Sequence, residues 1–137
     1  MQGELKVWLE SIGIKSPKLS AMHGDASGRR YYRLEEPKSI VMDSSDMKES
    51  VSVFVAVNER LVSAKVRTAD IKAYDLEKGF MLLEDIGTTH LFDKVEAGNA
   101  SAYYEKAIKT LAQVQETSSE GLEPYDADFL LSEMNLM

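Results

Sequence analysis

The chain has 137 residues, 44% of them hydrophobic and 28% charged, which suits one modest globular domain with a single core. A net charge of −7 argues against nucleic acid and against an anionic membrane surface as partners, because both require a basic footprint. The lack of cysteine excludes a disulfide framework, a thiolate metal site and a cysteine nucleophile. With no secretory h-region and no apolar run of membrane-spanning length, we expect a cytoplasmic protein.

The first third of the chain has the pattern of one helix followed by three short strands. Leu5, Trp8, Leu9 and Ile12 follow helical spacing and predict a helix that ends near Gly13. Strand-like segments come next, separated by a Gly-containing loop and a Pro-containing turn: residues 18–22, 29–34 and 39–42. This pattern predicts a hairpin and a third antiparallel strand.

A second helix and two further strands are predicted after these. Polar residues at 43–46 offer N-caps for a helix that carries Val57 and Leu61 on one side. Strands are expected at residues 70–74 and 80–83, joined by a Gly-containing turn. Five antiparallel strands with one helix inserted after the third form an α+β architecture.

The remaining residues are predicted to be helical. A long helix is expected at residues 101–116, with Ile108 and Leu111 on one side, and Asp126 is placed to cap a last helix. The chain stops at Met137, inside that apolar helix and without a C-cap. We therefore expect a truncated protein with bare apolar helix faces, which favour self-association or dimerisation through the C-terminal helices.

The segment 24–33 is the densest cationic cluster of this acidic chain. Its small residues would let backbone N–H groups approach phosphate oxygens, and Ser27 adds a hydroxyl donor. Strand alternation places Arg29 and Arg33 on one face and Arg30 on the other. The alternative, which spacing alone favours, is an ordinary hairpin turn with a solvated basic strand, since the loop matches neither Walker A nor G-x-G-x-x-G.

Neither histidine indicates a catalytic or metal site. The tripeptide His23-Gly24-Asp25 has the letters of a kinase-type H-G-D, but the Asn required five residues after the Asp is replaced by Arg30. His90 has no second His, Cys or clustered carboxylate in the nearby sequence. We therefore treat the tripeptide as a coincidence and predict no metal ligand in this chain.

Residues 80–87 form an apolar strand that runs into an acidic turn. The backbone of residues 84–86 would offer one donor and one acceptor in an apolar slot, as an adenine requires. The plain alternative is a buried strand and a loop. A third hypothesis, in which Glu84 and Asp85 form an acid/base pair, is weaker because adjacent residues of an extended chain face opposite sides.

Together these segments resemble the aminoglycoside phosphotransferase-like family, which shares the protein-kinase architecture. Within it they are most similar to the bacterial anomeric kinases that act on the cell-wall sugars N-acetylmuramate and N-acetylglucosamine. The resemblance covers nearly the whole chain in the right order. It rests on these matching blocks: residues 24–33 (G-D-A-S-x-R-R-Y-x-R), Val41-Met42-Asp43, Val53-Phe54-Val55, residues 66–87 and Pro124-Tyr125-Asp126.

The resemblance implies a protein-kinase-like N-lobe over residues 1–87 and the helical start of a truncated C-lobe over residues 88–137. It also implies phosphoryl transfer to a sugar hydroxyl, dependent on ATP and Mg²⁺, in the full-length enzyme. The loop at 24–28 would cover the phosphates and residues 83–86 would be the hinge. The residues expected to contact the nucleotide are Gly24, Asp25, Ala26, Ser27, Gly28, Arg29, Arg30, Met42, Leu83, Glu84, Asp85 and Ile86.

The chain departs from the family pattern at three points. Gly28 stands where a bulky aromatic residue is common, which should loosen the loop. The position of the phosphate-binding Lys of many kinases falls on Met42, so Arg29, Arg30 or Arg33 would have to supply the positive charge. Nothing resembles the catalytic loop or the Mg²⁺-binding Asp segment, both of which belong to the C-lobe, so we expect the chain to be inactive alone.

Three classes of function remain open. The chain is the nucleotide-binding part of a sugar kinase, a non-catalytic module that binds nucleotide or a partner, or an interaction domain of the same architecture. An H-x-D-x-x-x-x-N block followed by a D-x-D-like segment in the next stretch of the gene would select the enzyme. The acceptor sugar is not encoded in these residues, because the acceptor pocket of this architecture lies mainly on the other lobe.

Overall fold

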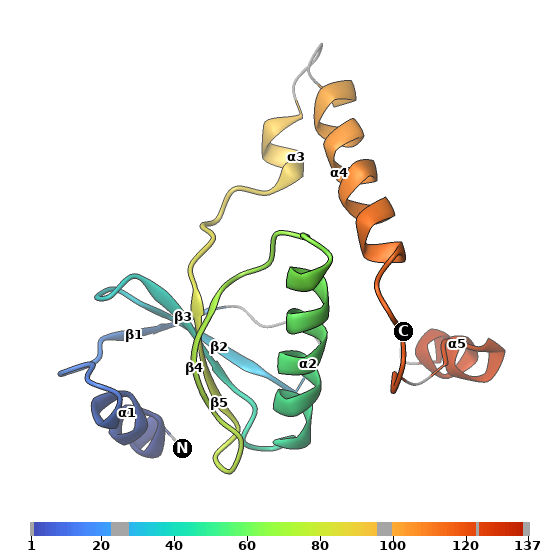
Figure 1. Cartoon of the computed structure of the whole chain (residues 1–137). Helices are drawn as coiled ribbons and strands as arrows, with labels where there is room; N and C mark the ends of the chain where they lie inside the picture. Colours follow the sequence, from blue (N-terminus) through green and yellow to red (C-terminus); the bar gives the residue numbers. More distant parts are fainter. Residues whose placement is uncertain (1, 23–27, 96–99, 123, 136–137) are drawn as a thin grey trace.

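The computed structural model describes residues 2–22, 28–95, 100–122 and 124–135, and it shows an α+β fold (Figure 1). The elements in chain order are α1 (Gln2–Ser11), β1 (Leu19–Ala21), β2 (Arg30–Leu34), β3 (Ser39–Asp43), α2 (Glu49–Ser63), β4 (Ile71–Asp75), β5 (Phe80–Glu84), α3 (Leu91–Lys94), α4 (Ala100–Gln115) and α5 (Ala127–Met134).

One antiparallel sheet contains all five of these strands, in the order β1-β2-β3-β5-β4. The central pairs β2–β3 and β3–β5 are in unbroken register over five residues each, whereas β4 pairs with β5 through an irregularity between Ile71 and Ala73. The predicted five antiparallel strands with one helix inserted after the third are confirmed. The order brings the ends of β2 and β5 to the same end of the sheet, with only β3 between them.

Helix α1 covers one face of the sheet (Figure 1). Its residues Leu5, Trp8 and Leu9 are buried, and the Trp8 ring lies 5.7 Å from the ring of Phe80 between centroids. The sheet residues buried in the same cluster are Tyr32, Leu34, Val41, Phe80 and Leu82. Gly13 has a φ of +94°, in the left-handed region that suits glycine, and it stops the helix as the sequence predicts.

Helix α2 covers the opposite face. Val51 of α2 is buried with Met42 of β3 and with Met81 and Leu83 of β5. Partly buried residues complete this layer: Tyr31, Ile40, Phe54, Val55 and Ile71. Residues of odd number on β2 therefore face α2 and those of even number face α1, as strand alternation predicts.

The predicted N-caps of α2 at residues 43–46 are wrong. The helix begins at Glu49, and its N-cap residue Lys48 makes no side-chain capping bond. The reason is that the carboxylate of Asp43 is already occupied, by the guanidinium of Arg30 and the backbone N–H of Ser45. The chain enters the helix through backbone turns instead.

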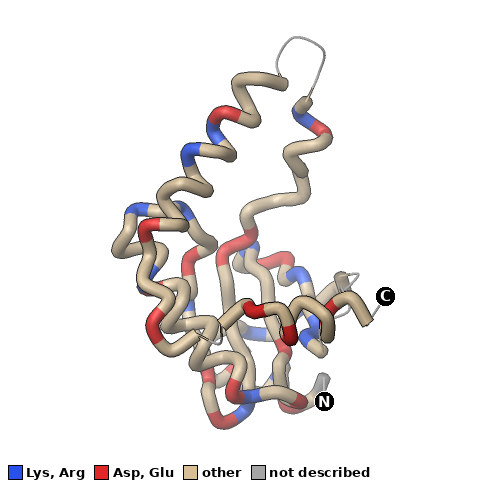
Figure 2. The backbone as a smooth tube through the Cα atoms, turned by 90° about the vertical axis from the view of Figure 1, so that its right-hand side faces the viewer, with Lys and Arg blue, Asp and Glu red and all other residues tan. Residues whose placement is uncertain are grey.

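The helices after the sheet lie against little else. No described residue of α3, α4 or α5 is buried. The predicted cap of the last helix is confirmed, because the Asp126 carboxylate accepts a hydrogen bond of 2.9 Å from the Phe129 backbone. The charges along α4 are of both signs (Figure 2). No helix of the described residues combines the length and the apolar character needed to cross a membrane.

Candidate functional site

The described residues that were predicted to contact the nucleotide lie near the start of β2, in β3 and at the end of β5. Residues 24–27 of the expected phosphate loop lie outside the described residues. Gly28 and Arg29 immediately precede β2. The expected hinge, residues 83–86, is at the far end of β5, beside the end of β2. Met42 lies between the two ends in β3.

The Arg30 side chain lies on the α1 face of the sheet, where hydrogen bonds hold its guanidinium. Its guanidinium contacts Asp43 at 3.3 Å, Asp46 at 2.9 Å and the hydroxyl of Ser45 at 3.1 Å. The hydrogen bond with Asp43 raises the pKa of Arg30, with Asp46 adding to it. Burial raises the pKa of Asp43, whose side chain is 2% exposed, but the hydrogen bonds from Ser45 and Arg30 outweigh burial and leave this pKa below its usual value.

Arg33 reaches across β3 to the hinge. Its Nε lies 3.0 Å from Oδ2 of Asp85 and its Nη2 lies 3.4 Å from Oδ1, a two-pronged contact. The Asp85 carboxylate is 1% exposed and also accepts a 2.8 Å bond from the backbone of Gly87, whose φ is +93°. The bond from Gly87 lowers the pKa of Asp85 most, burial opposes it, and Arg33 lowers the pKa further.

Glu84, the neighbour of Asp85, has a different set of partners. Arg67 donates to both of its carboxylate oxygens, at 2.6 and 2.7 Å, and the backbone of Asp70 donates to it at 3.1 Å. The bonds from Arg67 lower the pKa of Glu84 most, followed by the bond from Asp70. Because the two acidic residues pair with arginines on separate strands or loops, they do not form the acid/base pair considered above.

Arg29 stands at the loop end of the α2 face. Its guanidinium carbon lies 5.9 Å from the centroid of the Phe54 ring of α2. Its Nε is buried and has no hydrogen-bond partner within the described part of the chain. Met42 is fully buried between Val51 and Met81, so its side chain supplies apolar packing beneath α2.

The hinge presents backbone as well as side chains. The N–H of Glu84 donates to the carbonyl oxygen of Asp70 at 2.8 Å. The N–H of Ile86 has no partner among the described residues, and the Ile86 side chain is 75% exposed. The backbone donor of Ile86 is therefore open, three residues after the buried Leu83.

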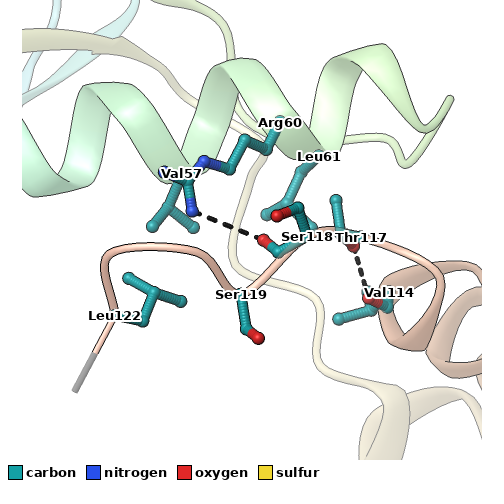
Figure 3. Close-up of a pocket in the computed structure, with 8 residues that line it drawn as sticks. All are labelled: Val57, Arg60, Leu61, Val114, Thr117, Ser118, Ser119 and Leu122. Carbon is teal, nitrogen blue, oxygen red and sulfur yellow. Dashed lines mark hydrogen bonds between the residues drawn. The ribbon is translucent and has the colours of Figure 1, made fainter. Parts of the chain in front are cut away.

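Two cavities of the described part lie away from these residues. One, of about 180 Å³, separates α2 from the segment after α4, and Figure 3 shows Arg60 of α2 reaching the carbonyl oxygen of Ser118 there, at 3.4 Å. Apolar side chains line much of it, including Val57, Leu61 and Leu122. The other, of about 650 Å³, lies between the start of α1 and the β4–β5 turn. Neither contains a residue predicted to contact the nucleotide.

The described residues contain no group of three or more His, Asp or Glu side chains that could hold a metal ion. The His90 backbone donates to the Asp93 carboxylate at 2.9 Å, at the start of α3. His23 lies outside the described residues.

The chain is similar over nearly its whole length to two sugar kinases. It is 36% identical over 126 residues to the N-acetylmuramate/N-acetylglucosamine kinase of Pseudomonas putida, a match that covers 90% of this chain and 37% of that protein. It is 33% identical over 147 residues to the protein of the same name from Pseudomonas aeruginosa, covering 97% of this chain and 44% of that protein. The chain thus spans about two fifths of the length of these curated relatives.

No family model matches the chain, and no solved structure matches it. The relationship to sugar kinases therefore rests on sequence similarity to about two fifths of each of these two proteins. The kinase-like lobe and the aminoglycoside phosphotransferase-like family have no such support and remain proposals.

Proposed function

We propose that this chain is the nucleotide-binding part of an ATP-dependent sugar kinase whose acceptor is N-acetylmuramate or N-acetylglucosamine. In this proposal, residues 1–87 are a protein-kinase-like N-lobe of the aminoglycoside phosphotransferase-like type, and residues 88–137 begin the second lobe. The observation that carries the proposal is the similarity to two proteins named as kinases of these sugars, along 90% and 97% of the chain.

The α2 face supports nucleotide binding with three features. Partly buried Ile40 offers an apolar surface for a base, and it packs against the core cluster that contains Leu83. The open N–H of Ile86 offers a donor to the edge of that base. Arg29 places a positive charge at the other end, beside the segment expected to cover the phosphates.

Mg²⁺ does not fit the described residues, since they hold no cluster of carboxylates for it. We therefore assign the described residues no metal ligand. The family resemblance places the catalytic base in the second lobe. Bound ATP supplies the phosphoryl group, and the role of this chain is to bind and orient the nucleotide. Phosphoryl transfer depends on positioning and on charge neutralisation, so we expect the chain alone to transfer no phosphate.

A segment replacement tests the proposal. The matched segment of the Pseudomonas putida kinase is replaced by this chain, and ATP-dependent phosphorylation of N-acetylmuramate and N-acetylglucosamine is measured. We expect the chimera to phosphorylate at least one of these sugars, whereas this chain alone phosphorylates neither. A chimera that folds, as judged by a cooperative thermal transition, but neither binds ATP nor phosphorylates either sugar would refute the proposal.

A non-catalytic module that binds nucleotide or a partner is the second candidate. ATP binding by this chain, together with a folded chimera that binds ATP but is inactive on both sugars, would select this alternative.

A further inference from the structure

We propose that the three arginines of residues 29–33 divide the work of the nucleotide face: Arg29 contacts the phosphates, Arg33 positions the base-binding hinge through Asp85, and Arg30 is structural. The inference rests on the proposed function. It assigns to Arg29 the positive charge that the side chain of Met42 lacks.

Arg30 is excluded from the nucleotide face by its side of the sheet. Its partners among the described residues are Asp43, Ser45 and Asp46, which belong to β3 and to the loop before α2. The contact with the buried Asp43 carboxylate lies on the α1 face, since Asp43 alternates with Val41 of the α1 cluster. A phosphate on the α2 face would have the sheet between itself and this charge.

Arg33 is on the correct face but at the hinge end. In the register of the sheet it stands opposite Ile40, which stands opposite Leu83, and so its side chain crosses one strand to reach Asp85. Asp85 in turn holds the backbone of Gly87 at 2.8 Å. The pair therefore fixes the course of the chain on both sides of Ile86, whose open N–H we assign to the base.

Arg29 is on the same face at the opposite end. Arg33 lies four residue steps along nearly extended chain from Arg29, a span of about 13 Å at the rise of a strand, which a nucleoside triphosphate can bridge. Phe54 holds the Arg29 guanidinium from the α2 side through its ring, a contact that leaves the N–H groups able to donate. The Arg29 Nε has no hydrogen-bond partner in the described residues, so this guanidinium is not held by a carboxylate there as that of Arg30 is.

The assignment is tested with half-ligands on the whole 137-residue chain. Adenosine probes the hinge and tripolyphosphate probes the phosphate end, with ATP as the complete ligand, and each affinity is measured by titration followed by NMR. The variants are Arg29→Ala, Arg33→Met and Asp85→Asn. Arg60→Ala is the matched control, because Arg60 contacts Ser118 on the far side of α2 and lies outside the proposed site.

We expect Arg29→Ala to lower the affinity for tripolyphosphate and for ATP about tenfold to a hundredfold, which is the cost of one charge-assisted contact. The affinity for adenosine should be unchanged. Arg33→Met and Asp85→Asn should lower the affinity for adenosine and for ATP and leave the affinity for tripolyphosphate unchanged. Both should also shift the amide signals of Ile86 and Gly87, and Arg33→Lys should restore part of the adenosine affinity.

The outcomes separate the two levels of the proposal. If the wild-type chain binds neither half-ligand nor ATP, the proposed function fails and the assignment fails with it. Two results would leave nucleotide binding in place and show that the division among the arginines is wrong, provided that the wild-type chain binds the probes. In the first, Arg29→Ala leaves the affinity for tripolyphosphate unchanged. In the second, Arg33→Met lowers the affinity for tripolyphosphate as much as that for adenosine.

Discussion

Helices α1 and α4 have similar sequence patterns but different environments. Leu5 and Leu9 of α1 are fully buried against the sheet, whereas Ile108 and Leu111 of α4 are 65% and 57% exposed. Both stripes have the spacing that predicts an amphipathic helix, and both segments are helical. Apolar periodicity thus predicts the helix, but the partner that covers its apolar face is a separate property of the fold.

The same contrast separates the whole sheet region, residues 2–87, from the helical region after it. The sheet region has two apolar clusters and two ion pairs that cross the sheet, Arg30–Asp43 and Arg33–Asp85. The helical region contacts α2 through the Arg60–Ser118 hydrogen bond, and a small cavity lies beside this bond (Figure 3). We therefore expect the free energy of unfolding to depend almost entirely on the sheet region.

The largest expected effect compares two leucines. Leu34→Ala removes a fully buried side chain from the α1 face and should lower the free energy of unfolding by about 2–5 kcal/mol. Leu111→Ala removes an exposed side chain of α4 and should change it by less than about 0.5 kcal/mol. Urea unfolding of both variants measures the difference. Equal costs would mean that α4 is packed in solution and would break the comparison.

Two glycines, one in the sheet region and one in the helical region, should differ in the stability that is lost when they are replaced by alanine. Gly79 and Gly121 have φ values of +76° and +74°, but a Cβ on Gly79 would lie 2.7 Å from the carbonyl oxygen of Ser44, while one on Gly121 would meet only Arg60 Nη2 at 4.0 Å. Gly79→Ala should cost about 2–4 kcal/mol from strain and overlap. Gly121→Ala should cost less, and a Gly121→Ala variant as unstable as Gly79→Ala in thermal unfolding would contradict this.

Acid should destabilise the sheet region through Asp43 and Asp85. Both carboxyls have folded pKa values below their usual range, so the stability they provide is full above the unfolded value of about 3.9 and is lost as pH falls through the lower folded values. Asp43→Asn should cost about 1.5–3 kcal/mol at pH 7 and flatten the acid dependence. Glu105→Gln, which removes one partner of an exposed pair with Lys109, is the control and should cost less than about 1 kcal/mol at pH 7.

The elements of the chain could be predicted from its sequence because their signals are local. Helical spacing, Gly13 and Asp126 predicted the helices at both ends, and alternation predicted which arginines share a face. Helix α3, of four residues, was missed because it is too short for a periodic signal. The division at residues 87 and 88 remains a prediction.

The contacts of the candidate site could not be predicted, because they depend on strand order. Arg33 and Asp85 are 52 residues apart in the sequence and meet only because β5 lies next to β3. Glu84 and Arg67 depend on β4 closing the other side of β5. An apolar-and-acidic segment such as 80–87 indicates a strand and a turn, and it does not indicate which arginine its carboxylates will bind.

The exposed apolar side chains of the C-terminal helices should make copies of the chain associate. Phe129, Leu130 and Met134 of α5 are all more than a third exposed, and apolar surface of this kind is buried when copies associate. We expect the mass measured by light scattering to rise toward that of a dimer with concentration, and Leu130→Asp to reduce the rise. A monomeric mass at high concentration, with α5 amides protected from hydrogen exchange, would show that the helix folds back onto its own chain.

The smallest expected effect is at Gly28, where the aromatic residue common in the resembling family is missing. Unlike Gly79, Gly28 does not have a positive φ, and a Cβ there would meet only the flexible end of Met47, at 3.4 Å from Sδ. Ala therefore fits the backbone and mainly restricts the unfolded chain, so Gly28→Ala should stabilise the protein by about 0.4–1 kcal/mol. Thermal unfolding of Gly28→Ala and Gly79→Ala side by side measures the stabilisation expected for the first variant and the destabilisation expected for the second. A destabilised Gly28→Ala would mean that the Met47 side chain cannot yield, and that glycine here serves close packing of the β2 entry against the loop before α2.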